Sequence, residues 1–245
     1  MDRKLTSEEK EKTLLLWEVL KFFGVSSVDA CRGLWDSPAV ASRRTRCFET
    51  CSGPASAWIR LGELQARKIE CAPFDRRRFR SALQVARSLT VKEPVQFLGE
   101  LRDISAEAGV ALVLVPEIKK VPWYGATKWL LPHKAMILLS LRYKTEDQFW
   151  FSFFHEAVHV LHDGKKDLCI NEDGAIDPRE IRANEFASDI LIPKARNAEV
   201  AQLKSKAAVV DLAAKLGISP GIVVGRFQRL TGKWDTFNDL KRRLE

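Results

Sequence analysis

The sequence predicts an α+β fold that is mainly helical, with a small three-stranded sheet packed on one long helix. Residues 1–105 carry helical periodicity and helix-capping signals, whereas three short apolar runs between residues 110 and 142 are typical of buried strands. A strongly apolar helix that contains two histidines follows these runs. With 245 residues, of which 46% are hydrophobic, the chain has ample apolar material for a core.

We expect three segments along the chain. They are a helical N-terminal region at 1–105, a core at 106–198 and a C-terminal helical pair at 199–245. The C-terminal pair resembles a helix-turn-helix, with a tight turn at Gly217. Its second helix carries mainly Ile and Val and offers few side chains that could bind DNA bases. We therefore expect this pair to pack against the core.

Capping residues place the N-terminal helices. Gly24 ends a first apolar run, and Asp75 is a good N-cap for a helix at 76–90. Pro94 suits the first turn of a further helix, which extends through about Ala108.

The three strand candidates follow directly. Val110–Val115 is a short apolar run bounded by glycine and proline, and Ala135–Arg142 is a second apolar run. Between them, Gly125–Leu130 is a third candidate, closed by Pro132. These runs predict a three-stranded sheet immediately before the histidine-bearing helix.

That helix has a clear predicted start and is expected to be buried. Thr145 and Gln148 have the spacing of a capping box, and five aromatic residues lie between positions 149 and 154. A helix this apolar is buried on most sides. Histidines on such a helix need a partner for each ring.

The segment His155-Glu-Ala-Val-His159 carries the chemistry. His155 and His159 are four residues apart, so they lie on one helix face and can converge on a single Zn²⁺ ion. Glu156 is rotated about 100° from His155, which makes it unsuited to be a third ligand beside them. It can instead act as general base toward a water molecule. The segment therefore predicts a zinc hydrolase.

A peptidase zinc site needs a third protein ligand and an open position. His162 shares the face of the other histidines, but three rings along one helix would span roughly 10 Å of axis, too far for one tetrahedron. We expect His162 to support the site or cap the helix. A further helix is predicted from Glu180 and ends before Pro193; Glu180 lies on its apolar stripe, and Glu185 is rotated about 140° away. Helical phase favours Glu180. Glu185 remains the alternative, since its segment resembles the third-ligand segment of thermolysin-like peptidases.

With both segments in view, the chain resembles the ImmA/IrrE family of zincin metalloendopeptidases from about Gly109 to Lys194. The matching motifs are His155-Glu-Ala-Val-His159 and the Ala-Asn-x-Phe-Ala-x-x-Ile-Leu-x-Pro run after Glu180. The resemblance implies metal ligands at His155, His159 and Glu180, and a general base at Glu156. Family members often have Glu where this chain has Arg182.

The resemblance also implies a partner. Additional runs before the histidines resemble a subgroup found in antitoxins of toxin–antitoxin modules, where the peptidase-like part follows an Xre-type helix-turn-helix. The expected substrate is a DNA-binding repressor or antitoxin, cleaved by a zinc-dependent endopeptidase. The alternative is a non-proteolytic antitoxin or regulator that uses the same fold as a protein-binding module. Tyr124 and His162 are the expected candidates for stabilising an oxyanion.

Charge and cysteine content indicate which partners and which cellular compartment to expect. The net charge is +8, and all of this surplus falls within residues 39–92, which hold 12 Lys or Arg against 4 Asp or Glu. Such a region could bind an acidic protein or nucleic acid, although a solvated helical surface is the simpler interpretation. Five cysteines without framework spacing, no apolar leader and no long apolar run predict a cytoplasmic protein outside the membrane.

Overall fold

The computed structural model describes residues 6–35, 46–119, 121, 123–140, 144–165, 168–171 and 177–244. The start of the basic region, residues 39–45, lies outside the described residues, as do residues 141–142 at the end of the strand predicted at Ala135–Arg142.

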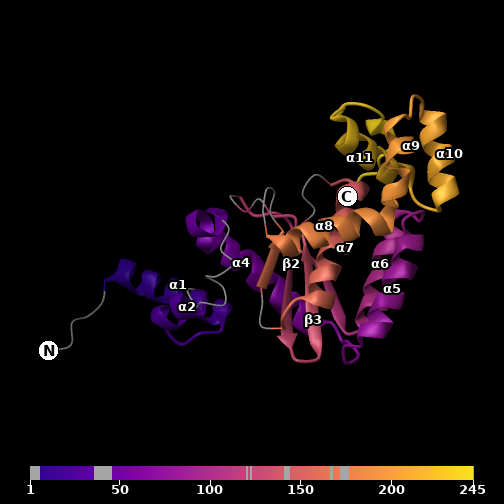
Figure 1. Cartoon of the computed structure of the whole chain (residues 1–245). Coiled ribbons are helices and arrows are strands. Elements are labelled where there is room, and N and C mark those ends of the chain that lie inside the picture. The colour runs from indigo at the N-terminus through magenta and orange to yellow at the C-terminus, as the bar shows by residue number, and fades with distance from the viewer. Residues whose placement is uncertain are drawn as a thin grey trace.

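The chain folds into helices around one small sheet (Figure 1). The helices are α1 (Ser7–Phe23), α2 (Val28–Trp35), α4 (Arg46–Lys68), α5 (Arg76–Leu89), α6 (Pro94–Glu107), α7 (Glu146–His162), α8 (Pro178–Leu191), α9 (Asn197–Ala201), α10 (Lys206–Leu216) and α11 (Pro220–Thr231), with 3₁₀ turns η1 (Lys194–Arg196) and η2 (Asn238–Leu240). The strands are β1 (Val110–Leu114), β2 (Gly125–Leu131), β3 (Lys134–Leu139) and β4 (Leu168–Asn171).

The predicted fold class is confirmed, since the three expected strands form and pack beside α7. A fourth strand, β4, joins them in the order β1-β3-β2-β4. Strand β1 runs parallel to β3, whereas β2 is antiparallel to both β3 and β4. The sheet is therefore mixed. Strand β2 lies between β3, its hairpin partner, and β4, which follows α7 in the sequence.

Alternating side chains of the sheet enter two separate hydrophobic clusters. On one face, Ile137 and Leu112 pack with α5, α6 and α7. On the other face, Met136 and Leu138 pack with Trp58 and other residues of α4. Because strand side chains alternate in direction, a sheet covered on both faces has apolar residues at nearly every position. This explains the uninterrupted apolar runs of β1 and β3.

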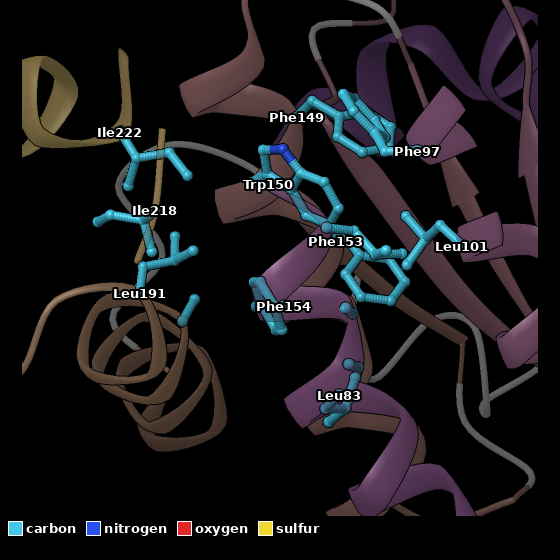
Figure 2. Packing of buried hydrophobic residues seen from close by; sticks show 14 of the residues in the cluster. Leu83, Phe97, Leu101, Phe149, Trp150, Phe153, Phe154, Leu191, Ile218 and Ile222 are labelled. Atoms are coloured by element: carbon cyan, nitrogen blue, oxygen red, sulfur yellow. The ribbon is translucent and has the colours of Figure 1, made fainter. Parts of the chain in front are cut away.

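Helix α7 forms the centre of the larger cluster. Phe149, Trp150, Phe153 and Phe154 are all buried. Figure 2 shows these aromatic rings between side chains of α6 on one side and side chains of α8, α11 and the turn before α11 on the other. The labelled neighbours are Leu83, Phe97, Leu101, Leu191, Ile218 and Ile222. Burying each ring stabilises the fold by about 1.5–3 kcal/mol, and together the rings fix the position of the histidine-bearing turns.

The C-terminal segment passes over the start of α7 (Figure 1). The Glu146 N–H donates to the Arg242 carbonyl at 3.1 Å, and Arg242 forms an ion pair with the buried Glu146 carboxylate at 2.5 Å. Lys241 pairs with Asp147 at 2.7 Å. Gly221 of α11 lies against Glu146, where a Cβ atom would collide with the carboxylate. The charged C-terminal end is thus part of the support for α7.

The predicted capping box at the start of α7 is wrong. Thr145 is the N-cap residue, but its side chain makes no capping hydrogen bond. Its backbone instead forms an antiparallel bridge with Arg243, and the neighbouring Glu146 N–H is satisfied by Arg242. The backbone of the C-terminal segment therefore satisfies the first N–H group of α7.

Among the described residues, no single helix has the length and apolar character needed to cross a membrane. The pair Lys206–Leu216 and Pro220–Thr231 meets the length and composition criteria only when taken together, and the two helices are bent by 113°.

Candidate metal centre

His155 and His159 lie on one face of α7 and are fully enclosed. Their exposed fractions are 0% and 1%, and their Nε2 atoms are 3.2 Å apart. The four-residue spacing on a helix places one ring above the other, as the sequence predicts. The two buried Nε2 atoms lie close enough to bind one metal ion and could supply two of its three protein ligands.

Glu180 reaches the same point from the first turn of α8. That turn is anchored because Asp177 caps the helix by accepting a hydrogen bond from the Arg179 N–H. One Glu180 oxygen is 2.9 Å from Nε2 of His155, and the other is 3.3 Å from Nε2 of His159. The structure thus brings together the three predicted ligands from two successive helices, α7 and α8.

These three residues fit a metal ion. One ligand atom from each residue lies within 4.8 Å of the others. In a tetrahedral site with metal–ligand distances of about 2.0–2.1 Å, ligand atoms are roughly 3.3 Å apart, close to the separations found here. The set contains two imidazoles and one carboxylate, which leaves a fourth position for a water molecule or a substrate.

Each histidine ring is oriented by a second hydrogen bond. The Nδ1 of His155 lies 3.0 Å from the Asn184 side-chain oxygen, and the Nδ1 of His159 lies 2.6 Å from Asp163. Arg182 holds the other Asp163 oxygen at 2.7 Å. An acceptor at Nδ1 keeps the proton there and leaves Nε2 free to bind a metal.

Glu156 lies beside the three ligands and is completely buried. The Thr127 hydroxyl of β2 donates to its Oε2 atom at 2.7 Å. Its Oε1 atom has no hydrogen-bond partner within the described part of the chain. At Gly125 a Cβ atom would lie 2.6 Å from Oε1, so only glycine leaves room for this carboxylate. One oxygen of the Glu156 carboxylate is therefore held by Thr127, and the other is available to accept a proton.

The two carboxylates have different proton affinities. Burial raises the pKa of Glu156 to about 7, against the opposing attraction of the histidines. Burial also raises the pKa of Glu180, but the contacts of its carboxylate with His155 and His159 outweigh burial and bring that pKa down to about 2. Glu180 is thus ionised at neutral pH, as a metal ligand must be.

The other candidate residues lie outside this set. Glu185 is exposed and lines an open groove along the outer face of α8. His162 is exposed at the end of α7. Tyr124 lines a small pocket with Thr145 and other residues at the start of α7. The described geometry brings none of these three side chains into the metal-binding set.

Three supporting residues were not anticipated from the sequence: Thr127, Asp163 and Asn184. Asp163 stands four residues after His159, and Asn184 four residues after Glu180. Both spacings place a polar side chain one helical turn from a ligand, a signal available in the sequence. Thr127 carried no such signal, because its contact with Glu156 depends on how β2 packs on α7.

The comparison with known families agrees with this geometry. Residues 113–228 match the Peptidase_M78 family model, described as an IrrE N-terminal-like domain. This match supports the resemblance to the ImmA/IrrE family. It also suggests a metallopeptidase, and its range includes the whole candidate metal centre. The ImmA/IrrE match extends to residue 228 within α11, beyond the resemblance visible in the sequence motifs. No curated protein matches the chain.

Proposed function

We propose that the protein is a zinc-dependent endopeptidase. The observation that carries the proposal is the set formed by buried His155, buried His159 and half-buried Glu180, with buried Glu156 beside it. Two imidazoles and a carboxylate that leave a position open are the donor set of peptidase zinc sites. When bound there, zinc supplies Lewis-acid polarisation of the peptide carbonyl and makes a water molecule more acidic.

The chain's own residues carry the proton transfers. Glu156 accepts a proton from the attacking water at its unengaged Oε1 atom, while Thr127 holds Oε2 in place. The same carboxyl group then delivers the proton to the leaving amine. Asn184 and Asp163 keep the imidazole rings in the orientation that the reaction needs.

The proposed substrate is a DNA-binding repressor or antitoxin partner. This part of the proposal follows from the likeness of the sequence motifs to the antitoxin-associated subgroup. Cleavage of such a partner would control transcription or a toxin–antitoxin response. The competing class is a regulator that binds the same partner without cutting it, and an experiment on Glu156 separates the two.

The decisive experiment replaces the general base. The purified chain is incubated with zinc and a co-expressed neighbouring Xre-type repressor, and fragments are identified by mass spectrometry. We expect Glu156→Gln to retain zinc but to lose cleavage by about 10²–10⁴-fold, the typical contribution of general acid–base catalysis. A chelator-treated wild-type sample serves as the control.

Two results would count against the proposal. Cleavage by the Glu156→Gln variant at the wild-type rate would refute the mechanism. A stable complex between the wild-type chain and the repressor, with no zinc-dependent fragments, would identify a binding module instead of a peptidase.

A further inference from the structure

The two histidine rings of the candidate metal centre are supported in different ways. Asn184, which lies 3.0 Å from the Nδ1 atom of His155, stands inside α8, one turn after Glu180. Asp163, which lies 2.6 Å from the Nδ1 atom of His159, is the C-cap residue of α7, where the backbone is already extended. Helix ends are less restrained than helix interiors. Helix α7 by itself therefore holds the Asp163 carboxylate less firmly than α8 holds Asn184.

A contact from α8 restrains the Asp163 carboxylate. The Arg182 guanidinium donates to Oδ1 of Asp163 at 2.7 Å, while Oδ2 faces the His159 ring. The side chains of Asp163 and His159 are 3% and 1% exposed, whereas that of Arg182 is 46% exposed. Both carboxylate oxygens are thus engaged, one by α7 and one by α8. The carboxylate cannot turn away from His159 without breaking a charge-assisted hydrogen bond to Arg182.

Arg182 affects the metal centre only through this carboxylate. It is two residues after Glu180 and is rotated about 200° around α8 from that ligand. Within the described part of the chain, the guanidinium contacts Asp163 and no metal ligand. The helix that supplies the third ligand therefore also supplies the residue that restrains the support of the second.

We propose that Arg182 is a positioning residue for His159, which it holds through Asp163 with Nε2 directed at the metal-binding point. The inference rests on the proposed zinc site and does not depend on peptide cleavage. An acceptor at Nδ1 keeps the ring proton there and leaves Nε2 free for the metal. Arg182 keeps the Asp163 carboxylate where it can accept that proton's hydrogen bond.

The direction of the effect on zinc affinity separates positioning from charge. A guanidinium group repels a bound cation, so the loss of its charge alone would make zinc bind more tightly. If Arg182 positions His159, its loss frees the Asp163 carboxylate and zinc binds more weakly. Loss of a residue that hydrogen-bonds a metal ligand weakens metal binding by about 10–100-fold. Arg182 acts one contact further out, so its effect should lie at the lower end of this range.

Zinc affinity of the full chain, measured by competition with a chromophoric chelator, tests the proposal. We expect Arg182→Ala to weaken zinc binding about tenfold. Arg182→Lys retains a charged donor and should recover part of this loss. In an Asp163→Ala background, Arg182→Ala should change the affinity by less than about twofold, because no carboxylate is left to position. Arg196→Ala is the matched control, since Arg196 is also a half-exposed arginine in one ion pair, with Glu199 at 3.0 Å, and its loss should leave the affinity unchanged.

The metal-free protein tests the same proposal without zinc. Long-range ¹H–¹⁵N spectra show which ring nitrogen carries the proton, at about pH 8, above the ordinary histidine pKa of roughly 6.5. We expect the His159 proton on Nδ1 in wild type. In Arg182→Ala the His159 signals should move toward the average of the two tautomers, while those of His155 stay unchanged. Asn184→Ala should move the His155 signals instead, which identifies the two rings.

The outcomes are distinguishable. Equal or tighter zinc binding by Arg182→Ala, or identical His159 signals in the two metal-free proteins, would overturn the positioning role and leave the zinc site standing. Additive losses in the double variant would overturn it as well, because Arg182 would then act independently of Asp163. If wild type bound no zinc while Arg182→Ala still moved only the His159 signals, the positioning role would hold and the proposed zinc peptidase would fail.

Discussion

At the scale of single residues, the position of a carboxylate on its helix decides whether it can bind the metal. Glu180 and Glu185 are five residues apart on α8, yet only Glu180 contacts the two histidines. Glu185 is turned outward and exposed. The apolar stripe of the helix faces α7, so a carboxylate on that stripe necessarily points at the histidines.

Metal affinity should therefore distinguish the two glutamates. Glu180→Gln removes a charged ligand and should weaken zinc binding by more than about 100-fold. Loss of a residue that only hydrogen-bonds a ligand weakens metal binding less, by about 10–100-fold. Glu185→Gln should leave the affinity unchanged. Competition with a chromophoric chelator measures both variants. Equal affinities for the two variants would contradict the ligand set.

Thr127 should act on the reaction rate through Glu156. Thr127→Val keeps the shape of the side chain but removes the donor to Oε2, so we expect kcat to fall about tenfold with little change in KM. Thr127→Ser restores the hydroxyl and should recover most of the rate. Zinc content and the far-ultraviolet spectrum serve as checks on the fold. Equal rates for the Val and Ser variants would show that the hydroxyl does not position Glu156.

The scale of single elements shows what the sequence could and could not predict. Strands β1, β2 and β3 were predictable because glycine and proline bound compact apolar runs. Strand β4 was missed because it has only four residues and follows a charged segment. Its pairing with β2 depends on the chain returning to that edge of the sheet after α7. The ligand helices were predictable from periodicity, whereas the support at the start of α7 came from the C-terminal end, about 100 residues away.

That support should be measurable as stability. Arg242→Ala leaves the buried Glu146 carboxylate without its main partner, and we expect a loss of about 3 kcal/mol in the free energy of unfolding. The neighbouring Arg243 is exposed, so Arg243→Ala should change this free energy by less than about 0.5 kcal/mol. Urea denaturation followed by circular dichroism compares the variants. The interpretation fails if both alanine variants unfold at the same urea concentration.

A second variant separates lost packing from lost charge pairing. Replacing both partners, as in Glu146→Met/Arg242→Met, removes the buried charge together with its counterion. Because apolar residues of similar volume often substitute well for a buried ion pair, this double variant should be more stable than Arg242→Ala alone.

At the scale of the whole molecule, one ionic group ties the N-terminal helices to the sheet that positions Glu156. Glu63 of α4 pairs with Lys128 of β2 and with Arg60, which also donates to the carbonyl of Phe22 in α1. Lys128 follows Thr127 in β2 and points to the opposite face of the sheet. The residues that hold Glu156 and those that hold α4 are therefore neighbours on one strand.

This ionic group should make stability depend on pH in a defined window. Burial raises the pKa of Glu63, but Lys128 and Arg60 outweigh burial and lower it below its ordinary value of 4.5. A lowered folded-state pKa means that the stabilisation is complete above that ordinary value and disappears as the pH falls through the folded-state pKa. Glu63→Gln should thus be less stable than wild type at pH 7, and the gap should narrow as the pH approaches 3. Urea denaturation across this range measures the difference in stability between wild type and Glu63→Gln.

Glu100, whose ion pair with Lys92 is exposed, supplies the matched control. The Glu100→Gln variant should show no comparable dependence of stability on pH. If the difference in stability between wild type and Glu63→Gln stayed constant with pH, the Glu63 carboxylate would not be the cause of the pH dependence.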